Sequence, residues 1–480
     1  MAQIISFASA LILIHWVSKT DVGIVAIGTL LATIGTMFTD SGMRAALIQR
    51  PDRVQEAANT ALIATATGGL IFAILALAAA PIIGRFVDHG DTVTQVAYAS
   101  AGLLIIHAAT IVPDALMQRE FAFVRRLFVD PSIALTYAIV AISLCANGWG
   151  VWGLLLGTYA SQVVALCLIW GLAKWRPQPG LASLSLWREM AGFGRHVLAG
   201  SIAGRVRDAL ETLIVNIGLS TAAGGIFRYG RRFSMLPAMA TIDVGSYVLF
   251  PAFSRMSDDP ARLRAAVLRA LRWVWLLSIM TSAALVALGE PVAWFLLHKE
   301  EWREAGTALM GLAGFGAGEA LIAVCVEACK SAGESSMLSR LGLVAIVLSG
   351  GLMLALLPFG IVGISIAVSV GALATGIVAL RFASRILQIP WMDLLKEILP
   401  PVVAAAPAGA TAWALEHFVV DAAHADRVVA GLGLAGEASA GLAVFLMVLG
   451  IVAPDRLGDF RRAAGSISAR IRHTRTAPAG

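Results

Sequence analysis

The chain has 480 residues, of which 58% are hydrophobic and only 14% are charged, and its mean hydropathy is +0.81 with a net charge of +6. This composition lies outside the range of soluble globular domains, so it excludes a soluble enzyme or binding module and predicts an integral membrane protein. Because a helix crosses a bilayer with roughly 20 apolar residues, the chain has room for about 14 crossings.

Fourteen apolar segments follow one another along the chain. Each is predicted to be a helix, because lipid offers no hydrogen-bonding partner to the open edge of a strand. The first segment lacks the basic residues and the cleavage site of a signal peptide, so we interpret it as the first crossing. The predicted segments are 2–17, 22–39, 57–83, 94–116, 127–146, 151–173, 190–217, 222–250, 273–297, 304–328, 337–357, 361–380, 398–416 and 428–453.

Positive charge alternates between the loops that join these segments. Of the 36 Lys and Arg residues, 25 lie in the loops after even-numbered segments or in the tail, if Arg340 at the adjoining end of the eleventh segment is counted with its loop, and 5 lie in the loops after odd-numbered segments. Cytoplasmic loops of membrane proteins carry the excess of Lys and Arg. We therefore predict that the even-numbered loops and both termini are cytoplasmic.

The six remaining cations all fall within the seventh and eighth segments, together with three acidic residues. An arginine in the middle of a bilayer costs about 2.5 kcal/mol on insertion scales, so a group of arginines has to face something polar. The cations are Arg195, Arg205, Arg207, Arg228, Arg231 and Arg232, and the acids are Asp208, Glu211 and Asp243.

Helical spacing groups the arginines of the eighth segment. Arg228, Arg231 and Arg232 are spaced i, i+3, i+4, which predicts that they share one face of a helix. A rise of about 1.5 Å per residue puts this face at the depth of Arg205 and Arg207 on the seventh segment, near the middle of the bilayer. Guanidinium groups pair with phosphate oxygens and stay charged at any accessible pH. The sequence therefore predicts a hydrated central cavity in which these five arginines bind a phosphate or pyrophosphate.

Carboxylates accompany the arginines of the seventh segment. Asp208 follows Arg205 by three residues and Glu211 follows Arg207 by four, so each carboxylate reaches a guanidinium on the same helix face. We expect Asp208, Glu211 and Asp243 to orient the arginines of the cavity.

The same residues also fit structural roles. Arg195 and Arg228 can extend their charged heads to the membrane interfaces. Arg207 and Glu211 can form an ion pair that only stabilises the protein interior. Both interpretations stay open at the level of the sequence.

A weak internal duplication relates the two halves of the chain. The glycine-rich stretch 148–153 corresponds to 359–363 at an offset of 210, and the stretch 46–57 corresponds to 250–266 at an offset of about 205. Because this offset spans six helices, the halves have the same orientation and are related by an axis along the membrane normal.

We therefore predict an all-α polytopic membrane protein with two six-helix lobes, related by a pseudo-two-fold axis, plus two additional helices. The lobes comprise residues 1–175 and 176–386, the additional helices lie within 387–455, and a basic tail occupies 456–480. The tail is expected to lie along anionic lipids of the cytoplasmic leaflet, where each cation adds about 1 kcal/mol.

Five regions, in order and at matching spacing within residues 1 to 400, carry a family resemblance: FTDSGMRAALIQRPD (38–52), LMQREFAFVRR (116–126), GWGVWGL (148–154), the arrangement around Gly225 to Pro237, and LFPAFSRMSDDPARLRAA (249–266). They resemble the polysaccharide transporter branch, which includes oligosaccharide and O-antigen flippases, of the multidrug/oligosaccharidyl-lipid/polysaccharide exporter superfamily.

The resemblance implies two six-helix lobes and translocation of an undecaprenyl-diphosphate-linked oligosaccharide from the cytoplasmic to the outer leaflet. Arg232 matches an arginine that is common in the family, and Glu211 stands where an aspartate is usual. Arg228, Arg231 and Ile217 depart from the family pattern. The substrate contacts of the family are therefore not transferred residue by residue to this chain.

We expect a flippase for cell-surface polysaccharide export rather than an enzyme. A multidrug or cation antiporter of the same superfamily is one alternative, although its cavity would need anionic groups. A membrane glycan polymerase or ligase is the other, although it would need a large outer loop. No Walker-type phosphate loop occurs, and we expect neither a cofactor nor a metal. Glu319, Glu327 and Glu437 lie in apolar segments and are candidates for proton transfer or for interfacial groups.

The expected location is the bacterial inner membrane, and the expected oligomeric state is a monomer. The expected partners are the lipid-linked oligosaccharide and anionic membrane lipids, and no nucleic acid.

Overall fold

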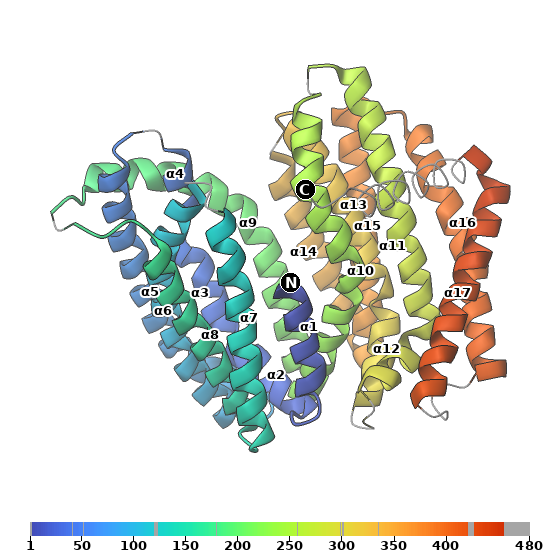
Figure 1. Ribbon diagram of the computed structural model, residues 1–480, viewed down its shortest axis with the longest axis horizontal. Coiled ribbons are helices and arrows are strands. Elements are labelled where there is room, and N and C mark those ends of the chain that lie inside the picture. Colours follow the sequence, from blue (N-terminus) through green and yellow to red (C-terminus); the bar gives the residue numbers. More distant parts are fainter. Residues whose placement is uncertain are drawn as a thin grey trace, which may run out of the picture. The chain divides into compact units, whose positions relative to one another are not determined.

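The computed structural model describes residues 2–455 apart from 41, 51, 120–122, 179, 257, 298, 300–301, 335 and 421–426. Side chains are also outside the description at 49, 123–127, 193–201, 236–248, 250–251, 336 and 427. Every regular element of the described chain is a helix, and no strand occurs in these ranges (Figure 1). The prediction of an all-α fold is confirmed.

The helices of the first half are α1 (Ala2–Leu13), α2 (Lys19–Gly28), α3 (Leu30–Asp40), α4 (Met43–Gln49), α5 (Val54–Gly84), α6 (Gly90–Arg119), α7 (Phe123–Ala146), α8 (Gly150–Leu172) and α9 (Leu184–Gly218). Those of the second half are α10 (Thr221–Ser254), α11 (Pro260–Leu297), α12 (Arg303–Gly311), α13 (Ala313–Ser331), α14 (Ser336–Leu356), η2 (Leu357–Phe359), α15 (Gly360–Ile386), α16 (Trp391–Leu415), the π-helical turn η3 (Glu416–Val420) and α17 (Arg427–Val452).

The chain forms two compact units. Unit 1 comprises Met1–Tyr229, Lys299–Glu304 and Leu338–Ala367, and unit 2 comprises Gly230–His298, Ala305–Met337 and Val368–Gly480. Helices α1 to α9 belong to unit 1, and α11, α13, α16 and α17 belong to unit 2, whereas α10 begins in unit 1 and continues in unit 2. The predicted lobe boundaries after residues 175 and 386 stay a prediction.

Membrane-spanning capacity is spread over the whole described chain. Ten of its helical segments are long and apolar enough to cross a membrane, and one of them, Met337–Ile386, covers two of the predicted segments. The arginine-bearing helices α9 and α10 are 35 and 34 residues long, and the side chains of each are described only in part. The prediction of a multi-pass membrane protein is confirmed, and the count of fourteen crossings stays a prediction.

The second predicted segment is divided into α2 and α3, and a further short helix, α4, follows it. Ser18 caps α2, because its hydroxyl accepts the N–H of Asp21 at 3.1 Å while the Asp21 carboxylate accepts the N–H of Ser18 at 3.1 Å. Gly42 precedes α4 with φ 70°, a left-handed conformation that glycine adopts without strain. The turn directs α4 toward α6 and α9, which α4 contacts.

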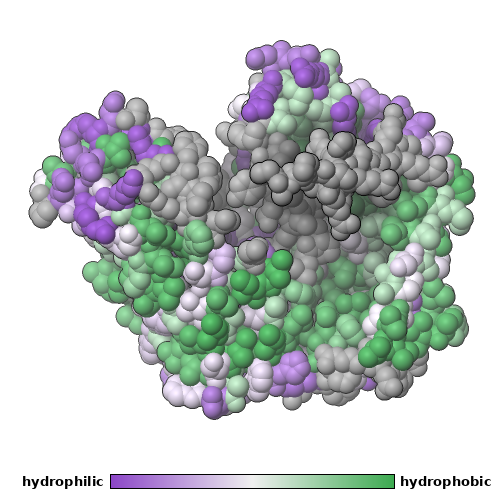
Figure 2. Space-filling model, in the orientation of Figure 1, coloured by the Kyte–Doolittle hydropathy of each residue, from purple (hydrophilic) through white to green (hydrophobic). Residues whose placement is uncertain are grey.

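Apolar side chains cover the flanks of the helices in unit 1. On α5, Leu70, Ile74 and Ile82 are 53%, 57% and 57% exposed, which suits contact with lipid rather than water. The space-filling view shows these flanks in green, and purple residues gather at the end of unit 1 that holds α4 (Figure 2). Apolar flanks with polar ends are the expected surface of a membrane-spanning helix bundle.

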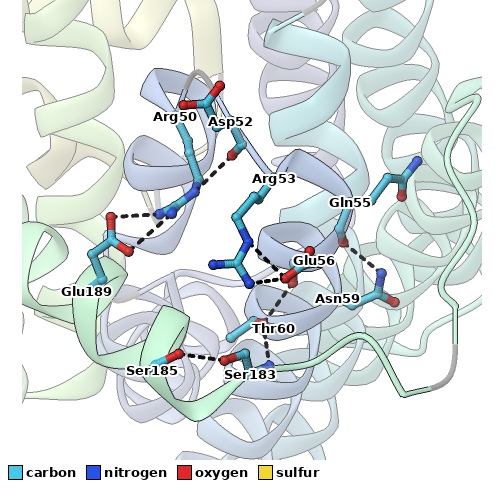
Figure 3. Close-up of polar contacts among 10 residues, drawn as sticks. All are labelled: Arg50, Asp52, Arg53, Gln55, Glu56, Asn59, Thr60, Ser183, Ser185 and Glu189. Carbon is cyan, nitrogen blue, oxygen red and sulfur yellow. Dashed lines mark hydrogen bonds and ion pairs between the residues drawn. The ribbon is translucent and has the colours of Figure 1, made fainter.

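The connector between α8 and α9 lies on the N-terminal turns of α5 (Figure 3). The Trp175 indole donates to the Gln55 side chain at 2.7 Å, the N–H of Gln178 donates to Asn59 Oδ1 at 2.7 Å, and the N–H of Ser183 donates to Thr60 Oγ1 at 3.0 Å. These bonds satisfy backbone groups of a non-helical stretch, which would otherwise be costly to bury.

The first turns of α9 are tied to the same end of unit 1 by an ion pair. Both terminal nitrogens of Arg50 donate to the Glu189 carboxylate at 3.1 Å, and Arg119 of α6 donates to the carbonyl of Arg50 (Figure 3 shows the first pair). Through these contacts the start of α9 packs with α4 and α5 of unit 1.

In unit 2, helix α16 follows the connector 387–390, and both are held by arginines of α11. Arg264 of α11 donates to the carbonyl of Leu387 at 2.7 Å and to the Gln388 side chain at 2.9 Å. Further along α11, Arg272 forms two 2.9 Å hydrogen bonds with the Glu397 carboxylate of α16. These bonds attach α16 to α11, and small residues let the two helices pack with α17.

Candidate functional site

The buried face of α9 holds one of the predicted arginine–carboxylate groups. Arg207 Nε lies 3.6 Å from Glu211 Oε1, and Arg207 Nη2 lies 3.9 Å from Asp208 Oδ1. Ser349 of α14 donates its hydroxyl to the same Glu211 oxygen at 3.3 Å. The side chain of Glu211 is 2% exposed and that of Arg207 is 14% exposed, whereas that of Asp208 is 48% exposed. Arg207 is therefore held by a buried carboxylate, as in the structural alternative.

Arg205 occupies a different environment two residues earlier on α9. It is exposed, and the neighbouring Gly204 has open space where a side chain would lie. The charge of Arg205 acts on the half-buried His107 of α6.

A charged group within unit 1 was missed by the sequence analysis. Arg44 of α4 pairs with Asp114 of α6 and lies 3.4 Å from Asp40 of α3. Gln118 donates to the same Asp114 carboxylate at 3.0 Å, and Asp114 is only 8% exposed. The charges of Arg44, Asp40 and Asp114 also act on His107.

The available sequence signal for this group was Asp114, a lone acid inside the apolar segment 94–116. Arg44 was counted as a loop cation because it follows the second segment. Its pairing with Asp114 joins residues 70 positions apart, which no local pattern indicates.

The packing of neighbouring residues decides which arginines of α10 are exposed. Phe227 and Tyr229 are buried, and the Tyr229 ring meets Trp302 edge to face at 4.8 Å between centroids. This fixes the rotation of α10 and leaves Arg228 and Arg232, one turn apart, exposed.

Arg231 lies on the same helix but in a drier position. Its guanidinium carbon is 4.9 Å from the centroid of the Phe315 ring of α13, within the range of a cation–π contact. Arg228 belongs to unit 1, and Arg231 and Arg232 belong to unit 2. The predicted spacing of the three arginines on one helix is therefore present, whereas their shared role stays a prediction.

Two predicted residues lie outside the described side chains, namely Arg195 and Asp243. Of the three candidates for proton transfer, Glu327 forms a 2.9 Å ion pair with Lys330 at the end of α13, Glu319 is half-buried on the same helix, and Glu437 is 1% exposed. Among the described residues, no group of three His, Cys, Asp or Glu side chains could hold a metal ion.

Comparison with solved structures identifies the fold. A structure of the lipid II flippase MurJ in an inward closed conformation superposes with a TM-score of 0.75, covering 95% of this chain and 98% of that chain at 12% identity. An inward-facing multidrug resistance MATE family transporter of the MOP superfamily superposes with a TM-score of 0.64, covering 80% of this chain and 94% of that chain at 16% identity. The chain therefore has the fold that these two transporters share.

Two curated proteins are similar in sequence. The succinoglycan biosynthesis transport protein ExoT of Rhizobium meliloti (strain 1021) is 22% identical over 313 residues, which cover 64% of this chain and 61% of that protein. The lipopolysaccharide biosynthesis protein WzxC of Escherichia coli (strain K12) is 21% identical over 294 residues, which cover 61% of this chain and 59% of that protein. The chain thus matches about three fifths of the length of these relatives.

The sequence also matches a protein-family model. The model described as polysaccharide biosynthesis protein matches residues 12–306, which include α2 to α11 and both arginine-bearing helices. The resemblance found in the sequence is thereby confirmed. This chain belongs to the polysaccharide biosynthesis protein family.

Proposed function

We propose that this chain is a flippase that moves an undecaprenyl-diphosphate-linked oligosaccharide across the bacterial inner membrane by alternating access, for cell-surface polysaccharide export. The observation that carries the proposal is the family match over residues 12–306 on a fold like that of the lipid II flippase MurJ. In this proposal the chain is a monomer with both termini in the cytoplasm, and its basic tail contacts anionic lipids.

The names of the sequence relatives support a glycan as cargo. ExoT is named for succinoglycan transport and WzxC for lipopolysaccharide biosynthesis. Both names concern polysaccharides of the cell surface, and neither names a drug.

The physical problem of such transport matches the composition of this chain. A sugar head group would lose the water around every hydroxyl in hydrocarbon, whereas a polyprenyl tail is stable there throughout. A flippase therefore has to supply a polar path for the head group only. Charged residues inside a predominantly apolar helical protein meet this need.

The arginines of α9 and α10 take different parts in the proposal. Arg205, Arg228 and Arg232 bind the diphosphate, since exposed guanidinium groups are accessible to a phosphate and pair with it in two-point geometry. Arg231, whose guanidinium lies over the Phe315 ring, is the fourth arginine that binds the diphosphate in this proposal. Arg207 contributes positive potential while Glu211 holds it in place.

The acidic partners complete the proposed site. Asp208, Glu211 and Asp243 keep the guanidinium groups oriented while the site is empty. Glu211 suits this task because it is buried and receives both Arg207 and Ser349.

Leaflet exchange of a labelled cargo tests the proposal. Purified protein in liposomes with a fluorescent undecaprenyl-diphosphate-linked oligosaccharide should accelerate exchange over protein-free liposomes. The variant R228A/R232A should slow it about 10-fold or more, since each hydrogen bond to a charged group contributes roughly 1.5–3 kcal/mol. Unchanged exchange in this variant would remove both residues from the mechanism.

The matched control is Arg262→Ala, which removes an exposed arginine at the start of α11, outside the proposed site. It should exchange cargo at the wild-type rate. A wild-type protein that moves no lipid-linked sugar but exchanges a cationic drug for protons would favour the antiporter alternative, for which the MATE-like fold is the supporting observation.

A further inference from the structure

Two glutamates are buried where η3 packs against α17 in unit 2. Glu437 is 1% exposed and Glu416 is 8% exposed. The two carboxyl groups act on each other electrostatically. Neither carboxylate oxygen of Glu437 receives a hydrogen bond from a donor in the described part of the chain. An ionised carboxylate in such a place would be strongly disfavoured.

Helix register places the two side chains opposite each other. A Cβ at Gly433 would lie 2.3 Å from Cγ1 of Val420, and a Cβ at Gly441 would lie 3.3 Å from the carbonyl oxygen of Ala408. Glu437 is halfway between these glycines at four-residue spacing, so it lies on the face of α17 that is pressed against α16 and η3. Glu416 is on the opposing face, between the residues that the two glycines contact.

The surroundings of the pair are apolar. Ala287, Leu288 and Phe295 of α11 pack with Ala412 of α16 and Leu434 of α17 to form a hydrophobic cluster beside it. Glycine and alanine at the contacts between α16 and α17 let the two helices approach closely.

Other titratable groups on the packed elements point elsewhere. His417 of η3 is exposed and stacks on Trp413 at 4.6 Å. Glu290 of α11 lies against Gly306 of α12, and Glu397 of α16 is bound to Arg272. In the described part of α17, Glu437 is the sole titratable residue. Asp421, His424, Asp426 and the side chain of Arg427 lie outside the description.

We propose that Glu416 and Glu437 form a proton-binding site, in which at least one proton is held between the two carboxyl groups at neutral pH. A shared proton supplies the donor that the Glu437 oxygens otherwise lack. A metal ion is not favoured, because hard cations take about six oxygen ligands or more, and among the described residues no group of three His, Cys, Asp or Glu side chains could hold one.

Proton release from this site has a mechanical consequence. Two ionised carboxylates would then face each other across a buried helix contact, where like charges repel more strongly than in water. The protonated pair therefore stabilises the packing of α17 on η3, and deprotonation loosens it. The role is independent of the proposed cargo, so its tests use no lipid-linked sugar.

Infrared spectroscopy of the full-length protein in nanodiscs tests the site directly. The wild-type protein should show a carboxylic-acid C=O stretching band at neutral pH that disappears at alkaline pH. The band should be lost in Glu437→Gln and in Glu416→Gln, and retained in Glu334→Gln, which changes an exposed glutamate after α13. Absence of the band from the wild-type protein, or its persistence in both variants of the pair, would overturn the proposal.

Thermal unfolding provides the second measurement. The folded pair holds a proton that the unfolded chain releases already at acidic pH, so the melting temperature of the wild-type protein should fall by several degrees as the pH rises from mildly acidic through neutral, and should level off once the folded pair has lost its proton. Glutamine mimics a neutral carboxyl group, so E416Q/E437Q should fold and should lose this part of the pH dependence. Equal pH dependence in both proteins would contradict the proposal.

A sodium ion is the alternative ligand that the two carboxyl groups could bind in place of a proton. Replacing sodium chloride by choline chloride at equal ionic strength should leave the wild-type melting temperature unchanged. Stabilisation by sodium that disappears in E416Q/E437Q would assign the pair to a metal ion and overturn the proton assignment. If the double variant fails to fold, the infrared titration of the wild-type protein still decides.

Discussion

Two helices that follow a connector, α9 in unit 1 and α16 in unit 2, are each held near their first turns by an arginine–glutamate ion pair. Each helix follows a connector, and each presents a glutamate to an arginine in two-point geometry. The positions of Glu189 and Glu397 differ by 208 residues, close to the offset of the internal duplication. Glu397 nevertheless lies in α16, after the two halves that the duplication relates, so the two attachments are similar arrangements rather than repeats of one sequence position.

Their surroundings differ. The side chain of Glu189 is 64% exposed, and that of Glu397 is 9% exposed. In unit 1 the attachment also uses neutral hydrogen bonds from the connector to Gln55, Asn59 and Thr60, of which Figure 3 shows the one between Ser183 and Thr60. In unit 2 the ion pair lies beside Trp275, which donates to the carbonyl of Ile398 at 3.0 Å. The start of α9 is therefore held near the surface by an exposed ion pair and several neutral hydrogen bonds. The start of α16 is held by an ion pair whose carboxylate is buried.

Removing Arg272 should give the largest effect on stability. Arg272→Ala leaves the Glu397 carboxylate buried without its partner, so we expect the free energy of unfolding in detergent to fall by about 3 kcal/mol. The control R272L/E397L removes both charges and should recover most of the loss. If Arg272→Ala lowers the free energy of unfolding no more than Arg50→Ala does, the proposed difference between the buried and the exposed attachment is wrong.

Removing Asn59 should give an intermediate effect. Asn59→Ala deletes the acceptor for the Gln178 N–H at a site that is only 5% exposed, and a lost hydrogen bond of this kind costs about 1 kcal/mol. Asn147→Ala, at an exposed helix end, is the matched control and should change the unfolding free energy by less than about 0.5 kcal/mol. Equal effects at both sites would show that the connector is not held by its hydrogen bonds.

Removing Arg50 should give the smallest effect. Because Glu189 is largely exposed, Arg50→Ala should lower the free energy of unfolding by less than about 1 kcal/mol, and the difference from wild type should shrink as salt is added. Denaturant titrations at low and high ionic strength measure this. A salt-independent loss would place the pair in a drier environment than its exposure indicates.

Local features of the chain were predictable because they depend on neighbours in sequence. Apolar segments gave the helices, and the spacing of Arg228 and Arg232 predicted two arginines one turn apart on one helix. The pairing of Arg207 with Glu211 also follows from four-residue spacing. Each of these contacts arises from the geometry of a single helix.

Contacts between helices were not predictable in this way. The pairing of Arg44 with Asp114 and that of Arg50 with Glu189 join residues 70 and 139 positions apart. Both arginines lie in a short stretch after the second segment, where the count of loop charges treats every cation alike. Only the packing of α4 against α6 and α9 distinguishes them.

The amino-acid order alone establishes an apolar, all-helical, multi-pass protein that concentrates arginine in two of its helices, because hydropathy and helical spacing act over a few turns. The folded arrangement decides which charged groups are dry and which are wet: Glu211, Glu397 and Glu437 are buried, whereas Arg205 and Glu189 are exposed. Burial depends on which distant helices pack together, and the cost of a charge depends on that burial far more than on its place in the chain.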